Sequence, residues 1–223
     1  MKLLNYDQQY EASKHLIILI TISLLVVWSG LDAVDYFAWV MLTLPSLGLI
    51  LGLSLTYKKF QFSTLTYVMV FFHIIVLLFG AKYRYAGVPL GIKITEMFDL
   101  NRNYFDRVGH FFQGFAPMFM FKELMLRKGY MKRSKFFYFV LMMSILGISA
   151  SWELSEFFAT LITQKPASYI LSSQGVLWDT QWDMVLAVIG GATTLTIFGK
   201  YHDHRISELK EVDQKAIPKA KHS

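Results

Sequence analysis

The sequence contains no cysteine and little charge. Of its 223 residues, 17% are charged and 54% are hydrophobic. The absence of cysteine excludes disulfides, thiolate metal sites and cysteine nucleophiles. A mean hydropathy of +0.40 with so little charge excludes an ordinary soluble domain, which needs more charge on its surface. The chain also lacks a Walker loop, a dinucleotide-binding glycine motif, GxSxG and HExxH.

Long apolar blocks dominate what is present. About 20 helical residues cross the ~30 Å hydrocarbon core of a bilayer, and six blocks approach or exceed that length. The blocks are too long and uniform for barrel strands, so helices are expected. They are Leu16–Gly30, Tyr36–Tyr57, Phe62–Gly80, Tyr104–Leu126, Phe136–Thr163 and Trp182–Lys200. The sequence therefore predicts an all-α polytopic membrane bundle of about six transmembrane helices, forming one domain over residues 1–200.

The basic residues predict the orientation. With the N-terminus in the cytoplasm, 16 of the 22 lysines and arginines fall on the cytoplasmic side and six on the outer side. This asymmetry places both termini in the cytoplasm. The net charge of +6 comes from short basic runs between apolar blocks, so the expected partner is the lipid bilayer and not nucleic acid. Residues 201–223 are expected to be a basic, partly disordered cytoplasmic tail with at most a short helical start.

The outer segment Lys82–Asn103 mixes basic and apolar residues. It is expected either to lie flat in the membrane interface or to form an ordinary loop. The second outer segment, 164–181, is more polar.

Ionisable side chains recur at one predicted depth. Charge inside a span is costly and marks a functional hypothesis. Three spans each carry a pair of ionisable groups three or four residues apart, which places the pair on one helix face. At ~1.5 Å per residue, Glu153 lies ~25 Å along the fifth span and Glu156 ~30 Å, near the outer surface. The candidate catalytic residues are Asp106, His110, Glu153, Glu156 and Asp183, and the candidate ligand-binding residues are Arg107 and Asp179.

The charges in this set do not balance, since five carboxylates accompany one arginine and one histidine. Neighbouring carboxylates cannot all ionise without cations. Shared protons, basic residues of the outer loop or a divalent metal would balance them. His110, Glu153 and Asp183 would suit zinc or manganese. Alternatively, the aspartates only cap helix starts, where the dipole favours acids, and tie the bundle together.

Three motifs carry a family resemblance: DRVGHF at 106–111, WELSE at 152–156, and DTQWD at 179–183 followed by GGA at 190–192. With the rest of the chain they resemble the YjdF-type bacterial inner-membrane proteins, a family of unknown function. From Phe105 to Ala192 their order is also similar to that of the VanZ-like membrane proteins. The VanZ-like pattern has a basic residue between the glutamate and the last aspartate. Lys165 is the only candidate for that residue here. The positions that would match the VanZ-like pattern are Asp106, His110, Phe111, Glu153 or Glu156, Asp183 and Gly190.

Together the resemblances imply a multi-pass protein of the bacterial inner membrane that works in the cell envelope. They do not imply a particular reaction.

The sequence leaves three alternative functions open. In the first, the outer-face cluster binds or acts on an anionic envelope lipid or lipid-linked headgroup. A carboxylate or His110 would be the base or metal ligand, Arg107 would neutralise phosphate, and enzymatic activity is left open. In the second, the protein is a small proton- or cation-coupled transporter. This function is disfavoured because the inner halves of the last three spans look almost wholly apolar and no internal repeat is evident. In the third, it is a structural or assembly protein.

Overall fold

The computed structural model describes residues 6–164 and 176–216, with side chains from 11 to 164 and from 176 to 209. All regular elements in these ranges are helical, which confirms the predicted all-α fold. They are α1 (Tyr6–Gly30), α2 (Tyr36–Thr56), α3 (Thr64–Tyr83), the 3₁₀ turn η1 (Tyr85–Gly87), α4 (Pro89–Met97), α5 (Phe105–Arg127), α6 (Lys135–Thr163), α8 (Asp179–Thr196) and α9 (Gly199–Ala216).

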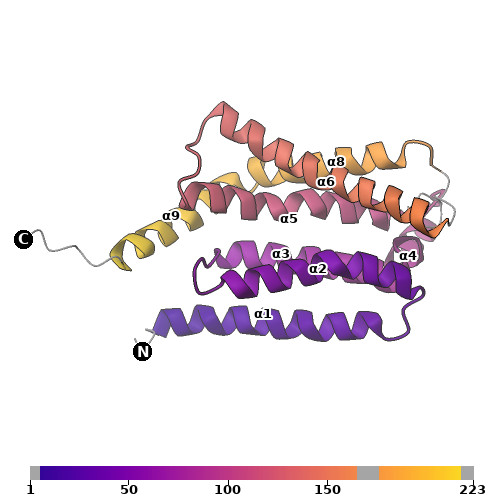
Figure 1. The fold of residues 1–223 in the computed structure, drawn as a ribbon, viewed down its shortest axis with the longest axis horizontal. Helices are drawn as coiled ribbons and strands as arrows, with labels where there is room; N and C mark the ends of the chain where they lie inside the picture. The colour runs from indigo at the N-terminus through magenta and orange to yellow at the C-terminus, as the bar shows by residue number, and fades with distance from the viewer. Residues whose placement is uncertain (1–5, 165–175, 217–223) are drawn as a thin grey trace, which may run out of the picture.

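The long helices form two groups that meet at α3 and α5 (Figure 1). Helices α1 and α2 pack against α3, whereas α6 and α8 pack against α5. Apolar side chains of α5, α6 and α8 form a buried core, in which Met118, Leu141 and Ala187 have no solvent exposure. Helix α5 is therefore the central helix of the bundle.

Helices α5 and α8 cross at very short range because both have glycines at the crossing. A Cβ atom on Gly114 of α5 would overlap the backbone carbonyl of Ala187. A Cβ on Gly190 of α8 would overlap the backbone carbonyl of Phe111. Small residues let helix backbones approach in this way. The contact fixes the relative position of the two helices that carry most of the candidate site.

Among the residues that the structure describes, four helices, α1, α2, α3 and α6, are long and apolar enough to cross a bilayer. Helices α8 and α9, which meet at an angle of 63°, would make a fifth span if they act as one broken span. The six predicted spans also included α5, which carries charge at both ends of a short apolar stretch. Since α3, α6 and α8 surround α5, protein rather than lipid covers its polar side chains.

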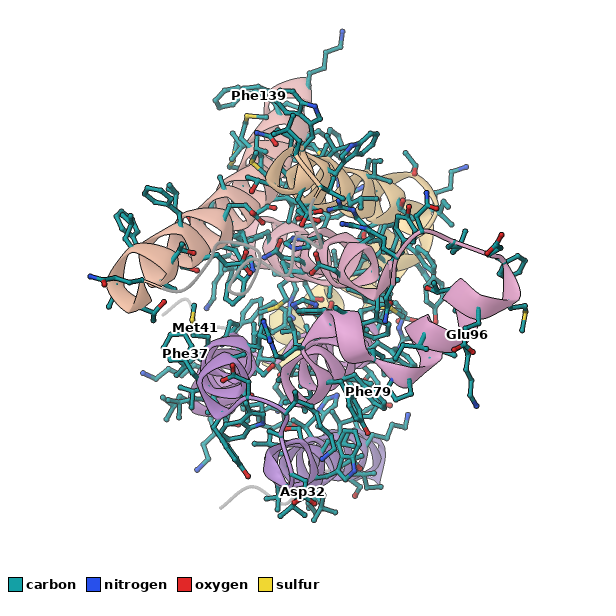
Figure 2. The ribbon with its side chains drawn as sticks, turned by 90° about the vertical axis from the view of Figure 1, so that its right-hand side faces the viewer. Asp32, Phe37, Met41, Phe79, Glu96 and Phe139 are labelled. Atoms are coloured by element: carbon teal, nitrogen blue, oxygen red, sulfur yellow. The ribbon has the colours of Figure 1, made fainter. Side chains whose placement is uncertain are left out.

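The segment Lys82–Asn103 folds into η1 and α4 at one end of the bundle. Figure 2 looks onto this end and shows α4, which carries Glu96, standing beside the other helices. Leu90, Met97 and Phe98 are 60%, 74% and 65% exposed. Exposed apolar side chains on a short helix at a bundle end are typical of a segment in the membrane interface, the first of the two predicted alternatives. The second outer segment lies largely outside the described residues, and Lys165 with it.

The C-terminal segment differs from the predicted tail. Residues 201–216 belong to helix α9, and the side chains of His202 and Ile206 are buried. Residues 217–223 lie outside the described residues. Helix α1 begins and α9 ends at the same end of the bundle, opposite α4 (Figure 1). The cytoplasmic location of both termini stays a prediction.

Candidate functional site

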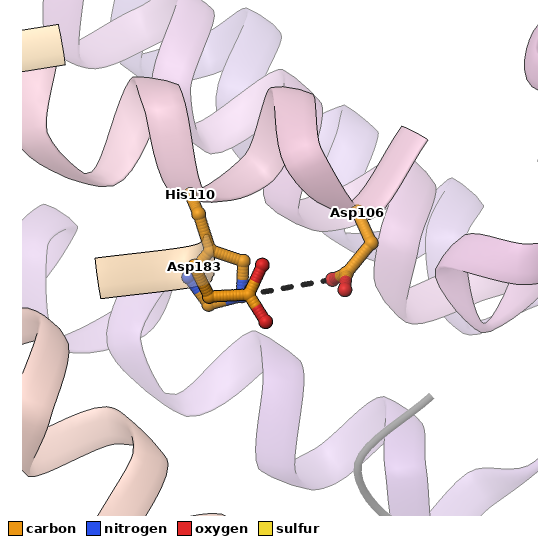
Figure 3. A group of neighbouring side chains, drawn as sticks. All are labelled: Asp106, His110 and Asp183. Atoms are coloured by element: carbon orange, nitrogen blue, oxygen red, sulfur yellow. Dashed lines mark ion pairs between the residues drawn. The ribbon is translucent and has the colours of Figure 1, made fainter. Parts of the chain in front are cut away.

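The ionisable pairs predicted on three helices converge at the α4 end of the bundle. His110 of α5 lies beside Asp106 of the same helix and Asp183 of α8 (Figure 3). Its Nε2 is 3.7 Å from Asp106 Oδ1 and 3.8 Å from Asp183 Oδ1. Its Nδ1 is 3.9 Å from Oε1 of Glu153 on α6. These four side chains are buried, so the structure assembles one compact site from three helices.

Two arginines bind the start of α8 to α5. The Arg107 guanidinium donates to the carboxylates of both Asp179 and Asp183. Arg102, just before α5, donates two hydrogen bonds of 3.1 Å to Asp179 Oδ1. Arg107 and Asp179 were predicted to bind a ligand, whereas the structure pairs them with each other. Buried ion pairs of this kind hold helix ends in register when their hydrogen bonds are well formed.

Asn103 and Tyr85 position the first turn of α5. The Asn103 amide donates to the backbone carbonyls of Ala86 and Val88, and its Oδ1 accepts from the backbone N–H of Phe105. The ring of Tyr85 packs in the space left by Gly109, where a Cβ would lie 2.9 Å from the ring. Burial, together with nearby carboxylates of which Asp106 is the first, raises the pKa of Tyr85 well above its usual value. Tyr85 therefore stays protonated at the edge of the site.

The two glutamates of α6 differ in their surroundings. Glu153 is 8% exposed and faces His110, and it accepts a hydrogen bond from Thr180 of α8. Glu156 is half-buried one turn further on and accepts from Trp152 of its own helix. The sequence singled out both residues alike. The structure brings only Glu153 into contact distance of the histidine.

His110 is held so that its two nitrogens face different groups. Nδ1 lies 3.2 Å from Gln113 Oε1, and this contact is a hydrogen bond in the tautomer whose Nδ1 carries the ring proton. Nε2 then presents a lone pair to Asp106 and Asp183. Asp106, His110 and Asp183 offer ligand atoms within 4.8 Å of one another. The predicted metal set contained Glu153 in place of Asp106. In the structure Glu153 faces the other ring nitrogen, so the atoms that lie together on the Nε2 side are those of Asp106 and Asp183.

A cavity of about 760 Å³ reaches this site from within the bundle. Residues of α2 and α3 line one side of it, and residues of α5 and α6 line the other. Its wall includes His110, Gln113 and Tyr85 at the site, and Phe121 and Leu124 near the opposite end of α5. Its size is that of a typical small-molecule site, which occupies roughly 300–1,000 Å³. His73 also lines this cavity, and its Nδ1 has no hydrogen-bond partner among the described residues.

A second polar cluster lies at the other end of α5, and the sequence reasoning missed it. Glu123 is fully buried and accepts hydrogen bonds from Ser63, Thr66 and Arg127. His202 of α9 lies 3.3 Å from Glu123 Oε2. The expectation that the inner half of this helix is almost wholly apolar is therefore wrong. The spacing of Glu123 and Arg127, four residues apart, was a signal that could have found the cluster.

Comparison with known proteins agrees with this architecture. Residues 14–204 match the family described as "Predicted membrane protein (DUF2238)". The chain belongs to this family. It is also 35% identical over 183 residues to the "Inner membrane protein YjdF" of Escherichia coli strain K12, an alignment that covers 82% of this chain and 88% of that protein. No solved structure matches the chain. The comparisons confirm the predicted YjdF-type family and give no support to the weaker VanZ-like resemblance.

Proposed function

We propose that this protein is a multi-pass protein of the bacterial inner membrane, with both termini in the cytoplasm, and that it binds an anionic lipid-linked headgroup at the His110 site. The observation that carries the proposal is the meeting of the long cavity with the buried polar cluster at His110. The inner-membrane location is supported by the name of the Escherichia coli relative. The orientation is supported by the distribution of lysine and arginine.

The shape of the cavity suits a lipid. Along α5 it runs from Gly109 to Leu124, about 22 Å at the helical rise per residue. That length exceeds one leaflet of a ~30 Å hydrocarbon core, so an acyl or prenyl chain fits along it. The cavity lies between α2 and α6, two candidate spans that belong to different helix groups. The length of the cavity and its place between two candidate spans therefore suit a lipid tail from the bilayer.

The polar end of the cavity suits a headgroup. Gln113, His110 and Tyr85 line it with hydrogen-bonding groups. Lipid-linked headgroups carry phosphate, and the two arginines of the site are already paired with aspartates. A phosphate therefore needs a further positive charge at His110, either a proton or a metal ion. Binding is the proposed function, and a reaction at the headgroup would be an addition to it.

A transport pathway through the bundle is less well supported. Between His110 and Lys122, which are about 18 Å apart along α5, buried apolar side chains such as Phe115, Met118 and Phe119 separate the two polar clusters. A proton relay needs a chain of polar groups, and along α5 the described residues do not supply one.

A pair of glycine substitutions tests the proposal. Gly147 of α6 lines the cavity, and a Cβ placed on it meets no atom within 4 Å. The Cβ of Gly147→Leu therefore meets no neighbouring atom, and its side chain would occupy part of the cavity. Gly52→Leu of α2 is the matched control, because Gly52 is equally unobstructed and does not line the cavity. Both changes improve helix propensity by up to about 1 kcal/mol, so neither should unfold the protein.

The readout is phospholipid retained by purified protein. The full chain is delipidated in detergent, incubated with phosphatidylglycerol vesicles or phosphatidylcholine vesicles, repurified and analysed by mass spectrometry. The parent and Gly52→Leu should retain phosphatidylglycerol in preference to phosphatidylcholine, and Gly147→Leu should retain at least tenfold less. Equal retention by Gly147→Leu and the parent would overturn the proposal.

A further inference from the structure

We propose that Asp106, His110 and Asp183 bind one divalent metal ion, zinc or manganese, through one oxygen of each carboxylate and Nε2 of the histidine. The inference deepens the function proposed above and rests on the same site, because the metal would supply the positive charge that a phosphate needs there. Its experiment reads bound metal and bound lipid separately, so that either can fail without the other.

The distances fit a shared ion. Zinc binds histidine nitrogen and carboxylate oxygen at about 2.0–2.2 Å, so two ligand atoms of one ion lie at most about 4.2–4.4 Å apart. His110 Nε2 is 3.7 Å from Asp106 Oδ1 and 3.8 Å from Asp183 Oδ1. Both separations exceed an ordinary hydrogen bond and fall inside that limit. All three ligand atoms lie within 4.8 Å of one another, so small shifts of the two carboxylates would bring them around one ion.

The charge of the site calls for a cation. Three buried carboxylates, those of Asp106, Glu153 and Asp183, face His110. A fourth, that of Asp179, joins them through Arg107, and the guanidinium groups of Arg102 and Arg107 are the two positive charges of the cluster. With a neutral His110 and all four carboxylates ionised, the cluster has an excess of two negative charges. Uncompensated charge in a buried site is strongly unfavourable. One divalent ion cancels the excess completely, and it sits where the two carboxylates that face Nε2 meet.

Glu153 provides an independent observation. Its side chain is more than nine-tenths buried, and its Oε1 has no hydrogen-bond partner among the described residues although it is aimed at the Nδ1 side of His110. Gln113 Oε1 lies on the same side, 3.2 Å from Nδ1. Metal-binding histidines nearly always donate their other ring N–H to a carboxylate or carbonyl, which fixes the ring and increases its basicity. The far side of His110 is built in this way.

The ligand set leaves room for a substrate. Three protein ligands with an open fourth position are typical of catalytic rather than structural zinc sites. One histidine with two carboxylates also suits manganese. The open position would take a phosphate oxygen of a headgroup that occupies the cavity beside His110.

The test compares two aspartate-to-asparagine variants of the full chain. Asp106→Asn removes a proposed ligand, whereas Asp203→Asn is the matched control, because Asp203 pairs with Lys122 and Arg133 at the other end of the bundle. Each protein is purified in detergent, stripped with chelator, equilibrated with Zn²⁺ or Mn²⁺, desalted and measured by inductively coupled plasma mass spectrometry. The parent and Asp203→Asn should hold about one metal per chain, and Asp106→Asn at least tenfold less.

A second measurement does not depend on whether Asp106→Asn folds. The thermal midpoint of the parent should rise on adding Zn²⁺ or Mn²⁺ and fall back on adding chelator, because an ion that binds only the folded state stabilises it. A parent that holds no metal and shows no change in midpoint would overturn the inference, as would folded Asp106→Asn with the metal content of the parent. Phosphatidylglycerol retained by such metal-free protein would leave the proposed lipid function standing.

Discussion

Arg107 of α5 donates to the same Asp183 carboxylate oxygen that lies 3.8 Å from His110 Nε2. Asp183 therefore belongs both to the ion pairs that fasten α8 to α5 and to the candidate site. Because one carboxylate serves both, the register of the two helices determines the geometry around His110. A change in the Arg107–Asp183 ion pair should therefore alter the geometry around His110, although Arg107 itself is directed toward α8.

The Arg107–Asp183 pair should show strong coupling. Arg107→Gln leaves Asp183 and Asp179 with less compensating charge in a buried environment, which costs about 3–5 kcal/mol of unfolding free energy. In the double variant Arg107→Gln/Asp183→Asn the loss should be smaller than the sum of the single losses. Denaturation in detergent, followed by circular dichroism, measures the cycle. Arg133→Gln, at a half-exposed pair, should cost less than about 1 kcal/mol. Additive single losses would contradict the coupling.

The glycine crossing of α5 and α8 should tolerate no added side chain. Gly114→Ala places a methyl group against the carbonyl of Ala187, and overpacking of this kind typically costs about 1–3 kcal/mol. Gly52→Ala adds the same methyl group where no atom lies within 4 Å, and should stabilise the protein by up to about 1 kcal/mol. Thermal unfolding of the two variants beside the parent measures the difference. Equal midpoints for the two variants would show that the helices are not in such close contact.

Glu153 and Glu156 should separate in their effect on metal affinity. Glu153→Gln weakens the acceptor on the Nδ1 side of His110, and loss of such a supporting group typically lowers metal affinity about 10–100-fold. Glu156→Gln alters a side chain that bonds within its own helix, so its affinity should stay within a few-fold of the parent. Competition with a fluorescent zinc chelator measures both. A larger loss in Glu156→Gln than in Glu153→Gln would contradict the arrangement around His110.

The buried Glu123 should hold α9 on the bundle. Glu123→Gln removes the charge that His202 and Arg127 face, so α9 should detach more often. Trypsin should then cleave at Arg205 several-fold faster than in the parent. Glu96→Gln, which changes an exposed glutamate of α4 at the other end of the bundle, is the matched control and should leave the cleavage rate unchanged. Equal cleavage of all three proteins would show that Glu123 is not what docks α9.

Much of the candidate site followed from periodicity. Asp106 and His110 share a face because they are four residues apart, and the depth of Glu153 follows from the rise per residue. These two rules place side chains from three helices at one height before any contact is known. The choice between Glu153 and Glu156 did not follow, because a difference of one turn in burial depends on how α6 packs against α5 and α8.

Other features depend on contacts that local sequence does not encode. Arg102 and Asn103 lie in a connecting segment, and their partners are 77 and 15–17 residues away. Helix α9 has the sequence of a basic tail because, up to residue 209 where its side chains are described, only His202 and Ile206 are buried. Contact between the polar side chains of α5 and lipid would be unfavourable. Placing this helix in the bundle becomes favourable only once neighbouring helices cover those side chains.

The most direct test of the lipid site is cryo-electron microscopy of the full chain in nanodiscs that contain phosphatidylglycerol. The account predicts elongated density along α5 between α3 and α6, ending in a headgroup beside His110. Gly147→Leu imaged in the same way should lack that density, whereas Gly52→Leu should keep it. A parent map in which side chains close the cavity, or in which it stays free of lipid density, would contradict the account.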